Sequence, residues 1–156
     1  MLSLPKPKAF VIRESKIVHR SPRIHPMARF VTEDAVCLMF DIKYEDIYVV
    51  ECWRYVVYVH AKGVSKFVSY ADFPPILGVQ LPTRAEMVKW RRRWRKQHHS
   101  FYRNLAPKWW VDFLIKEMHQ ANSRFELHHW QSLLGAIQFA FAEDSLRELQ
   151  QVLVCG

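Results

Sequence analysis

The chain has few cysteines, which could cross-link a small protein, and few glycines, which would make its backbone more flexible. Its 156 residues include only three cysteines and four glycines. Three widely spaced cysteines without a CxxC pair exclude a disulfide scaffold and a cysteine-ligated zinc finger, and they predict reduced thiols in an intracellular protein. There is no GxSxG turn and no glycine-rich loop, so the sequence indicates neither a nucleophile elbow nor a P-loop nucleotide site.

Long apolar runs are missing as well. The longest nearly uncharged stretch, 127–142, contains two histidines, two glutamines and a serine, which make it too polar to span a bilayer. Residues 1–10 carry Lys6 and Lys8 but no apolar segment, so we expect no secretory signal. The sequence therefore predicts a protein of the cytoplasm, free or on the nucleoid, without a membrane partner.

What the chain has is a large apolar fraction and an uneven positive charge. Half of its residues are hydrophobic and 14% are aromatic, which predicts one folded domain, alone or with an extension. The formal net charge is +8. Residues 1–31 contribute +6 and residues 83–106 contribute +7, whereas residues 32–82 and 107–156 are net acidic. Positive charge concentrated in two segments indicates a polyanionic partner.

The order of the patterns predicts an α+β protein. Residues 1–31 hold four of the eight prolines and form a basic arm, within which residues 9–19 favour a strand. Residues 32–82 are expected to form a small antiparallel β unit, with a winged helix as the alternative. Residues 83–156 are expected to form a bundle of about four helices, and the prolines and glycine of residues 74–82 mark the boundary.

Local signals divide the β unit further. Thr32 followed by two acids predicts a capped helix through residue 40, and a strand is the alternative. Residues 54–60 and 64–70 are rich in β-branched and aromatic side chains and predict a hairpin. Gly63 in its turn would supply the positive φ.

The helical region carries clear start signals. Thr83 and Ser123 each precede a glutamate by three residues, which is the pattern of a capping box. The expected helices are 83–104, 107–121, 123–142 and 145–154. Pro107 suits the start of the second of them.

The most distinctive motif lies in the first of these helices, where residues 89–96 read Lys-Trp-Arg-Arg-Arg-Trp-Arg-Lys. On a helix, Trp90 and Trp94 share one side and the cations share the other. Guanidinium groups bind phosphate oxygens, so this basic side predicts contact with a nucleic-acid backbone. The candidate contacts are Lys89, Arg91, Arg92, Arg93, Arg95, Lys96 and Arg103, with Arg20 and Arg23 of the arm.

Residues 32–76 also resemble a known family. The motifs are Thr32-Glu33-Asp34-Ala35 with Leu38, Tyr44-Glu45-Asp46-Ile47, the hairpin around Gly63, and Phe67-Val68-Ser69-Tyr70-Ala71-Asp72-Phe73. Together they resemble the excisionase and MerR-type winged helix-turn-helix. The resemblance implies DNA binding, with residues 44–53 as recognition helix and Lys62 and Lys66 in the wing. The composition of residues 47–50 favours a strand instead, so both structures stay open for this segment.

Patterns for catalysis and metal binding are weak. The adjacent pairs His98-His99 and His128-His129 point about 100° apart on a helix, so we expect no metal site and no cofactor. A nuclease would need carboxylates around a cation, and Asp46, Glu51 and Asp72 lack the accompanying lysine pattern. Asp112, Lys116 and Glu117 are more simply interpreted as a solvent-exposed helix pair. The sequence predicts a protein that is not an enzyme.

Two functions follow from these patterns. The first is non-enzymatic nucleic-acid binding through the basic helix and the arm, with DNA favoured slightly over RNA. The alternative is a structural subunit of a protein or ribonucleoprotein assembly. In that case aromatic helix faces around Trp109, Trp110 and Trp130 would contact other chains or further copies of this one.

Overall fold

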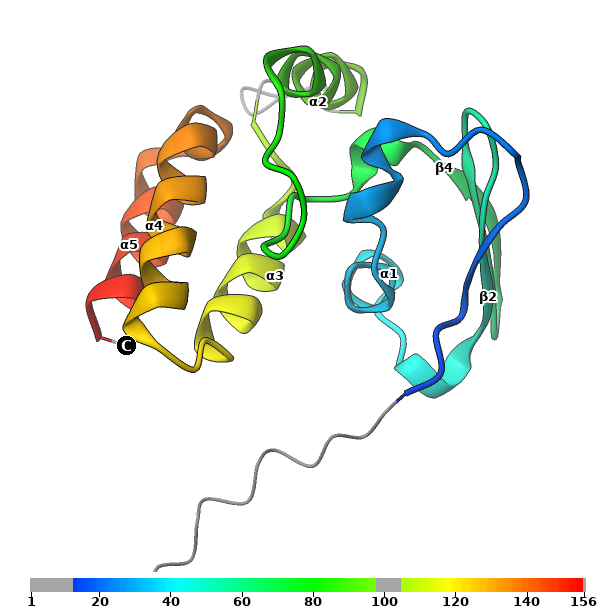
Figure 1. The fold of residues 1–156 in the computed structure, drawn as a ribbon, viewed down its shortest axis with the longest axis horizontal. Coiled ribbons are helices and arrows are strands. Elements are labelled where there is room, and N and C mark those ends of the chain that lie inside the picture. The colour runs from blue at the N-terminus through cyan, green and yellow to red at the C-terminus, as the bar shows by residue number, and fades with distance from the viewer. Residues whose placement is uncertain (1–12, 98–104, 156) are drawn as a thin grey trace, which may run out of the picture.

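The fold joins a small sheet to a group of helices. The computed structural model describes residues 13–97 and 105–155. Within these residues all strands precede residue 69 and four of the five α-helices follow, so the predicted α+β class is confirmed (Figure 1). No helix in this part of the chain is long and apolar enough to cross a bilayer.

The strands form one sheet in chain order. They are β1 (Ile17–His19), β2 (Ile47–Cys52), β3 (Val57–Ala61) and β4 (Val64–Val68). β3 and β4 each run antiparallel to the strand before them, but β1 runs parallel to β2. The antiparallel unit predicted within residues 32–82 is therefore present as β2, β3 and β4, and β1, which comes from the predicted arm, extends it in parallel. Residues 20–46 between β1 and β2 are long enough, and helical enough, to make the crossover that a parallel pair requires.

Residues 44–53 are a strand rather than a helix. A single 3-10 turn, η2 (Tyr44–Asp46), leads directly into β2. Val50 of β2 pairs with Val59 of β3, and both are fully buried. β-branched side chains pack well in such a buried pair. The strand alternative is confirmed, and the segment that the winged-helix resemblance would make a recognition helix lies inside the sheet.

The predicted hairpin is confirmed in β3 and β4. Gly63 lies in the turn with φ of 74°, a conformation that side chains with a Cβ atom rarely adopt. Both strands are shorter than predicted. At the other end the Trp53 amide bonds to the Val56 carbonyl and closes a second tight turn before β3 begins.

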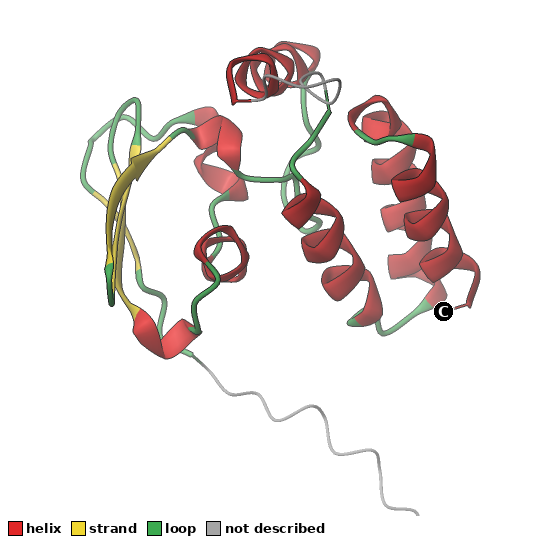
Figure 2. Ribbon diagram, turned by 180° about the vertical axis from the view of Figure 1, so that it is seen from behind, coloured by secondary structure: helices red, strands yellow, loops and turns green. Residues whose placement is uncertain are grey.

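One helix covers the inner side of the sheet. α1 (Glu33–Phe40) begins at Thr32, whose hydroxyl accepts a hydrogen bond from the Ala35 amide at 3.1 Å, so the helical interpretation is confirmed. It ends at Asp41, a non-glycine residue in the left-handed region, with φ of 53°. Figure 2 shows that the helices lie on one side of the sheet only.

The remaining helices are α2 (Arg84–Gln97), α3 (Lys108–His119), α4 (Arg124–Ile137) and α5 (Glu143–Cys155). All four predicted helices are present, and the predicted end of the first, near residue 104, lies outside the described residues. They do not form the single bundle of four helices that was expected. α3, α4 and α5 pack side by side, whereas α2 crosses one end of them and rests on the 3-10 helix η3 (Tyr70–Asp72) (Figure 1).

Part of the predicted basic arm, residues 13–31, packs into the fold, and its strand β1 lies within the residues 9–19 that were expected to favour a strand. Residues 13–31 contain β1 and the 3-10 helix η1 (Pro26–Phe30), and Met27 and Phe30 are fully buried. This part of the arm therefore belongs to the core, because its apolar side chains pack between the sheet and α2. Residues 1–12 lie outside the described residues.

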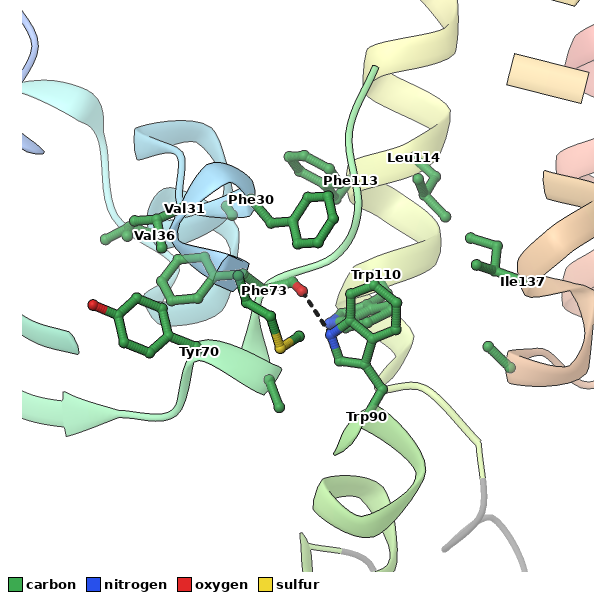
Figure 3. Close-up of a cluster of buried hydrophobic side chains, with 14 of the residues drawn as sticks. Phe30, Val31, Val36, Tyr70, Phe73, Trp90, Trp110, Phe113, Leu114 and Ile137 are labelled. Atoms are coloured by element: carbon green, nitrogen blue, oxygen red, sulfur yellow. Dashed lines mark hydrogen bonds between the residues drawn. The ribbon is translucent and has the colours of Figure 1, made fainter. Parts of the chain in front are cut away.

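A single core runs through both halves of the chain. Figure 3 shows Phe30 and Phe73 from the first half meeting Trp90 and Trp110 from the second. The two indole N–H groups donate to carbonyl oxygens of the first half, Trp90 to Phe73 and Trp110 to Asp72, each at 3.1 Å. The division at residue 82 stays a prediction. Trp110 and Trp130 are buried in this core, whereas Trp109 is only partly buried and packs against it.

Candidate nucleic-acid interface

The basic helix α2 is held in place by its apolar side. Its first turn has the predicted capping box, in which the Thr83 amide donates to Glu86 at 2.9 Å and the Glu86 amide donates to Thr83 at 3.2 Å. Trp90 and Trp94 point inward and are at most 1% exposed. The predicted segregation of tryptophans from cations is therefore confirmed for this helix.

Two arginine–carboxylate pairs fix α2 further. Arg29 of η1 forms a bidentate pair with Glu86, with distances of 2.5 and 2.6 Å. Burial favours the protonated form of Glu86, but hydrogen bonds from Arg29 and from the Thr83 amide outweigh it, and the net pKa of Glu86 is lowered. Arg93 binds Asp72 at 2.8 and 3.1 Å. Arg93 stays a predicted phosphate contact, but its guanidinium is already bound to Asp72 in the fold.

The other cations of α2 lie on its outer side. Exposed side chains are those of Arg84, Lys89, Arg91, Arg92, Arg95 and Lys96. Within the described residues no salt bridge neutralises any of these six. The Arg91 guanidinium lies over the Phe139 ring, 4.0 Å from its centre, in a cation–π contact that leaves its charge in place. The outer side of α2 therefore carries uncompensated positive charge.

Part of this charge converges on a pocket of about 250 Å³. It lies between α2, η3 and the turn that joins β2 to β3. Its lining residues are His25, Met27, Tyr55, Ser69, Tyr70, Ala71, Lys89, Arg92, Arg93 and Lys96. Four of them are cationic and none is a carboxylate, so an anion entering the pocket meets positive charge from α2 and no repulsion from its walls.

Three aromatic rings shape this pocket. The His25 ring stacks on Tyr70 with centroids 4.2 Å apart, and its Nδ1 atom accepts a hydrogen bond from the Met27 amide at 3.0 Å. Burial, and after it the charge of Lys89, lowers the pKa of His25, so the ring stays neutral at pH 7. Tyr55 is 74% exposed at the rim. Its ring offers a flat apolar surface beside the cations of α2.

The other predicted contacts are divided between the two ends of the sheet. Arg20 and Arg23 lie at the same end as Tyr55, but Arg20 is bound to Glu51 at 2.6 Å. Lys62 lies in the β3–β4 turn at the opposite end, where its amide bonds to Asp46. Lys66 is exposed on the edge strand β4. Arg103 lies outside the described residues, so the structure brings together only part of the predicted set.

A larger cavity of about 730 Å³ lies between α1 and α3. Asp34 and Glu117 face each other in it and share a hydrogen bond. Burial, and with it the charge and hydrogen bond of Asp34, raises the pKa of Glu117 to about 7. Of the three residues interpreted as a solvent-exposed helix pair, Asp112 and Lys116 are exposed, whereas Glu117 is half-buried because α3 turns it toward α1.

The carboxylates considered for catalysis all have structural partners. Glu51 binds Arg20, Asp72 binds Arg93, and Asp46 accepts a hydrogen bond from the Lys43 amide at 3.1 Å. In the described ranges 13–97 and 105–155 no group of three histidine, cysteine or acidic side chains could hold a metal ion. These positions therefore contribute to the fold rather than to a shared site.

The sequence did not indicate that Tyr55 and His25 would line the basic pocket. Tyr55 follows Arg54 in a turn, and His25 precedes a proline, so neither carried a periodic signal. Their meeting with Lys89 depends on how α2 crosses the end of the sheet, which is a tertiary contact. An exposed Arg-Tyr pair in a tight turn is the only local feature that could have indicated the rim.

Comparisons of the chain with family models, with curated proteins and with solved structures find no match. Function is therefore inferred from the geometry of the molecule. The relevant features are the uncompensated cations of α2, the basic pocket beside them and the aromatic groups at its rim.

Proposed function

We propose that the protein is a non-enzymatic nucleic-acid-binding protein that holds a phosphate backbone on the outer side of α2. The observation that carries the proposal is the convergence of Lys89, Arg92 and Lys96 on a pocket without carboxylates. Arg93 in the same pocket is compensated by Asp72, so these three supply the net positive charge. Binding would neutralise phosphates and release counterions, without reading bases.

The spacing of these cations suits a repeating polyanion. Lys89 and Lys96 are seven residues apart, so they are separated by about 10 Å along the helix axis. About three phosphates of one strand lie within that length, since successive phosphates are about 3.4 Å apart along a duplex axis. Arg92 lies between the two lysines on the same side of α2. Each cation can then meet its own phosphate.

The same geometry limits which predicted residues take part. Arg23 can extend the surface at the sheet end beside Tyr55, whereas Lys62 is one strand length away, about 17 Å. The wing implied by the winged-helix resemblance is therefore not continuous with the α2 pocket. The proposal assigns backbone contact to α2 and leaves Lys62 and Lys66 to a separate surface.

The test is the binding of fluorescein-labelled oligonucleotides, followed by anisotropy at several salt concentrations. Single-stranded and duplex forms of both DNA and RNA are compared. If about six phosphates are contacted, log Kd should change with log salt with a slope of about 5, since each contact contributes about 0.9. The triple variant Lys89→Glu, Arg92→Glu, Lys96→Glu should lose most of this affinity and about three units of slope.

A matched control separates local contact from total charge. Lys108, Arg124 and Arg147 are exposed on α3, α4 and α5, and reversing them changes the net charge by the same amount. The control variant should retain most of the affinity. Equal losses in the two triple variants would contradict the assignment to α2, and the absence of binding by the wild-type chain at low salt would contradict the proposed function itself.

A further inference from the structure

Among the described residues, no helix covers the outer face of the sheet. Both ribbon views show α1 and the other described helices on one side of the sheet only (Figures 1 and 2). Side chains alternate between the two faces of a strand. Tyr58 and His60 of β3 and Phe67 of β4 therefore point outward, because Val57, Val59 and Val68 are buried on the inner face. Tyr48 of β2 lies at a shift in the β2–β3 register between Ile47 and Val49, and its exposed side chain lies beside His60.

These four side chains form one row of rings across three strands. The centroid distances are 5.0 Å from Tyr48 to His60, 6.2 Å from His60 to Tyr58 and 4.9 Å from Tyr58 to Phe67. The Tyr58 hydroxyl is also held by the Ser65 hydroxyl at 2.5 Å. Ring contacts and this hydrogen bond give the row a fixed arrangement before any ligand arrives.

The ends of the row are strongly exposed. Tyr48 is 58% and Phe67 is 67% accessible to solvent. The fold gains little from large aromatic groups at such positions, and a contiguous exposed aromatic patch is typical of a binding surface. A sheet face that displays ring systems is also the arrangement on which unpaired bases stack in several kinds of nucleic-acid-binding domain.

The charges around the row favour a polyanion. The only carboxylate in the four strands is Glu51, and Arg20 neutralises it. Lys62 follows β3 in the adjoining turn, is exposed, and within the described residues has no salt-bridge partner. Lys66 pairs with the buried Val59, so its side chain lies on the inner side of the edge strand β4. The outer face thus combines aromatic rings with positive charge in the adjoining turn.

We infer that the outer face of the sheet binds single-stranded nucleic acid. Unpaired bases would stack on Tyr48 and Phe67 and on the rings between them, and Lys62 would contact the phosphates. The inference rests on the proposed function and adds to it a preference for single strands. It also assigns to Lys62 a surface that is separate from α2. A second copy of the chain fits this face less well, because its aliphatic positions are two half-buried valines, Val18 and Val49.

The experiment compares labelled single-stranded and duplex oligonucleotides of the same sequence, as DNA and as RNA. The double variant Tyr48→Ala, Phe67→Ala should weaken single-strand binding by about 10- to 100-fold, the range expected for lost base stacking. Duplex binding should change less than about twofold, because a duplex has no free base faces and uses α2. Phe67→Tyr should retain single-strand binding, since it keeps the ring.

The control variant is Phe125→Ala on α4, which removes a ring that is 74% exposed and far from the sheet in sequence. It should leave both affinities unchanged. Thermal unfolding of all variants checks that these exposed substitutions leave the fold intact.

The outcomes distinguish this inference from the proposed function. If the Tyr48/Phe67 variant binds single strands as the wild type does while the α2 variant binds nothing, the sheet inference is wrong and the proposed function stands. If the sheet variant loses single-strand binding and the α2 variant does not, the sheet inference stands and the α2 assignment fails. If light scattering shows a dimer that the Tyr48/Phe67 variant abolishes, the face is a contact between copies and the inference is overturned.

Discussion

The two sides of α2 show how one short basic segment serves two purposes. On the inner side, Trp90 and Trp94 are buried and Arg93 is paired with Asp72. On the outer side, Arg92 and Lys96 are exposed, and no described residue forms a salt bridge with them. Neighbouring arginines therefore have different roles, since one stabilises the fold while the other leaves its charge available to a ligand. Charge in a sequence indicates binding only where the fold has not already neutralised it.

The largest expected effect comes from breaking the inner side. Trp90→Ala removes a fully buried indole that packs on Phe30 and Trp110, and leaves the Phe73 carbonyl without its donor. The free energy of unfolding should fall by about 3–5 kcal/mol. Urea unfolding followed by circular dichroism measures it. Trp90→Phe, which restores part of the packing, should lose less, and a loss below about 1 kcal/mol in the alanine variant would contradict the packing shown in Figure 3.

The next effect comes from breaking the Arg29–Glu86 pair. Arg29→Ala would leave a carboxylate that is 4% exposed without its main partner, at a cost of about 2–4 kcal/mol near neutral pH. The folded-state pKa of Glu86 lies below its usual value, so the stabilisation is present above that usual value and is lost as the pH falls through the folded-state pKa. The difference in melting temperature between wild type and variant should therefore shrink in acid. A difference that stays constant from pH 7 to pH 3 would disagree with this assignment.

Arg92 and Arg93 allow the outer and inner sides of α2 to be compared within a single helical turn. Arg93→Ala should reduce the free energy of unfolding by about 1–2 kcal/mol, because the Asp72 side chain stays nearly buried and loses this partner. Arg92→Ala should change it by less than about 0.5 kcal/mol, as is usual for an exposed side chain. Affinity for nucleic acid should show the opposite order, because Arg92→Ala should reduce it more than Arg93→Ala does. Chemical denaturation and anisotropy on the same preparations test both statements, and equal effects in both assays would remove the distinction between the two sides.

The last effect depends on pH and concerns the contact between α1 and α3. The pKa of Glu117 is raised to about 7 in the folded state. Between about pH 4.5 and pH 7 the folded chain therefore keeps a proton on Glu117 that the unfolded chain has already released. The free energy of unfolding should therefore decline as the pH rises through that interval. Glu117→Gln should remove the decline and raise the melting temperature at pH 8 relative to wild type, with little change at pH 5. Glu126→Gln, on the rim of the same cavity, is the control and should leave the pH dependence intact.

Several local features were predictable because they depend on neighbours in sequence. Thr32 and Thr83 cap helices as expected, Gly63 adopts a positive φ in the predicted hairpin, and the four helices of the second half are present. A capping box or a tight turn needs only three or four consecutive residues. Their side chains and backbone can satisfy each other whatever the rest of the chain does.

Other features could not be predicted because they depend on distant partners. The parallel pairing of β1 and the meeting of Asp34 with Glu117 both join segments more than 30 residues apart. The resemblance to a winged helix-turn-helix placed a helix at residues 44–53, where the structure has a strand. The strand forms because β1 and β3 pair with its two edges and because Ile47, Val50 and Cys52 are buried on its inner face, an environment that composition favours but cannot establish.

The sequence by itself determined that this chain is an α+β protein with a helix that segregates tryptophans from cations. Periodicity alone fixes that segregation, since a turn of helix takes 3.6 residues. Tertiary structure decided which cations are free, because only the folded chain brings Asp72 to Arg93 and Arg20 to Glu51. It also decided that four aromatic side chains scattered from residue 48 to residue 67 form one row, because strand pairing sets their spacing.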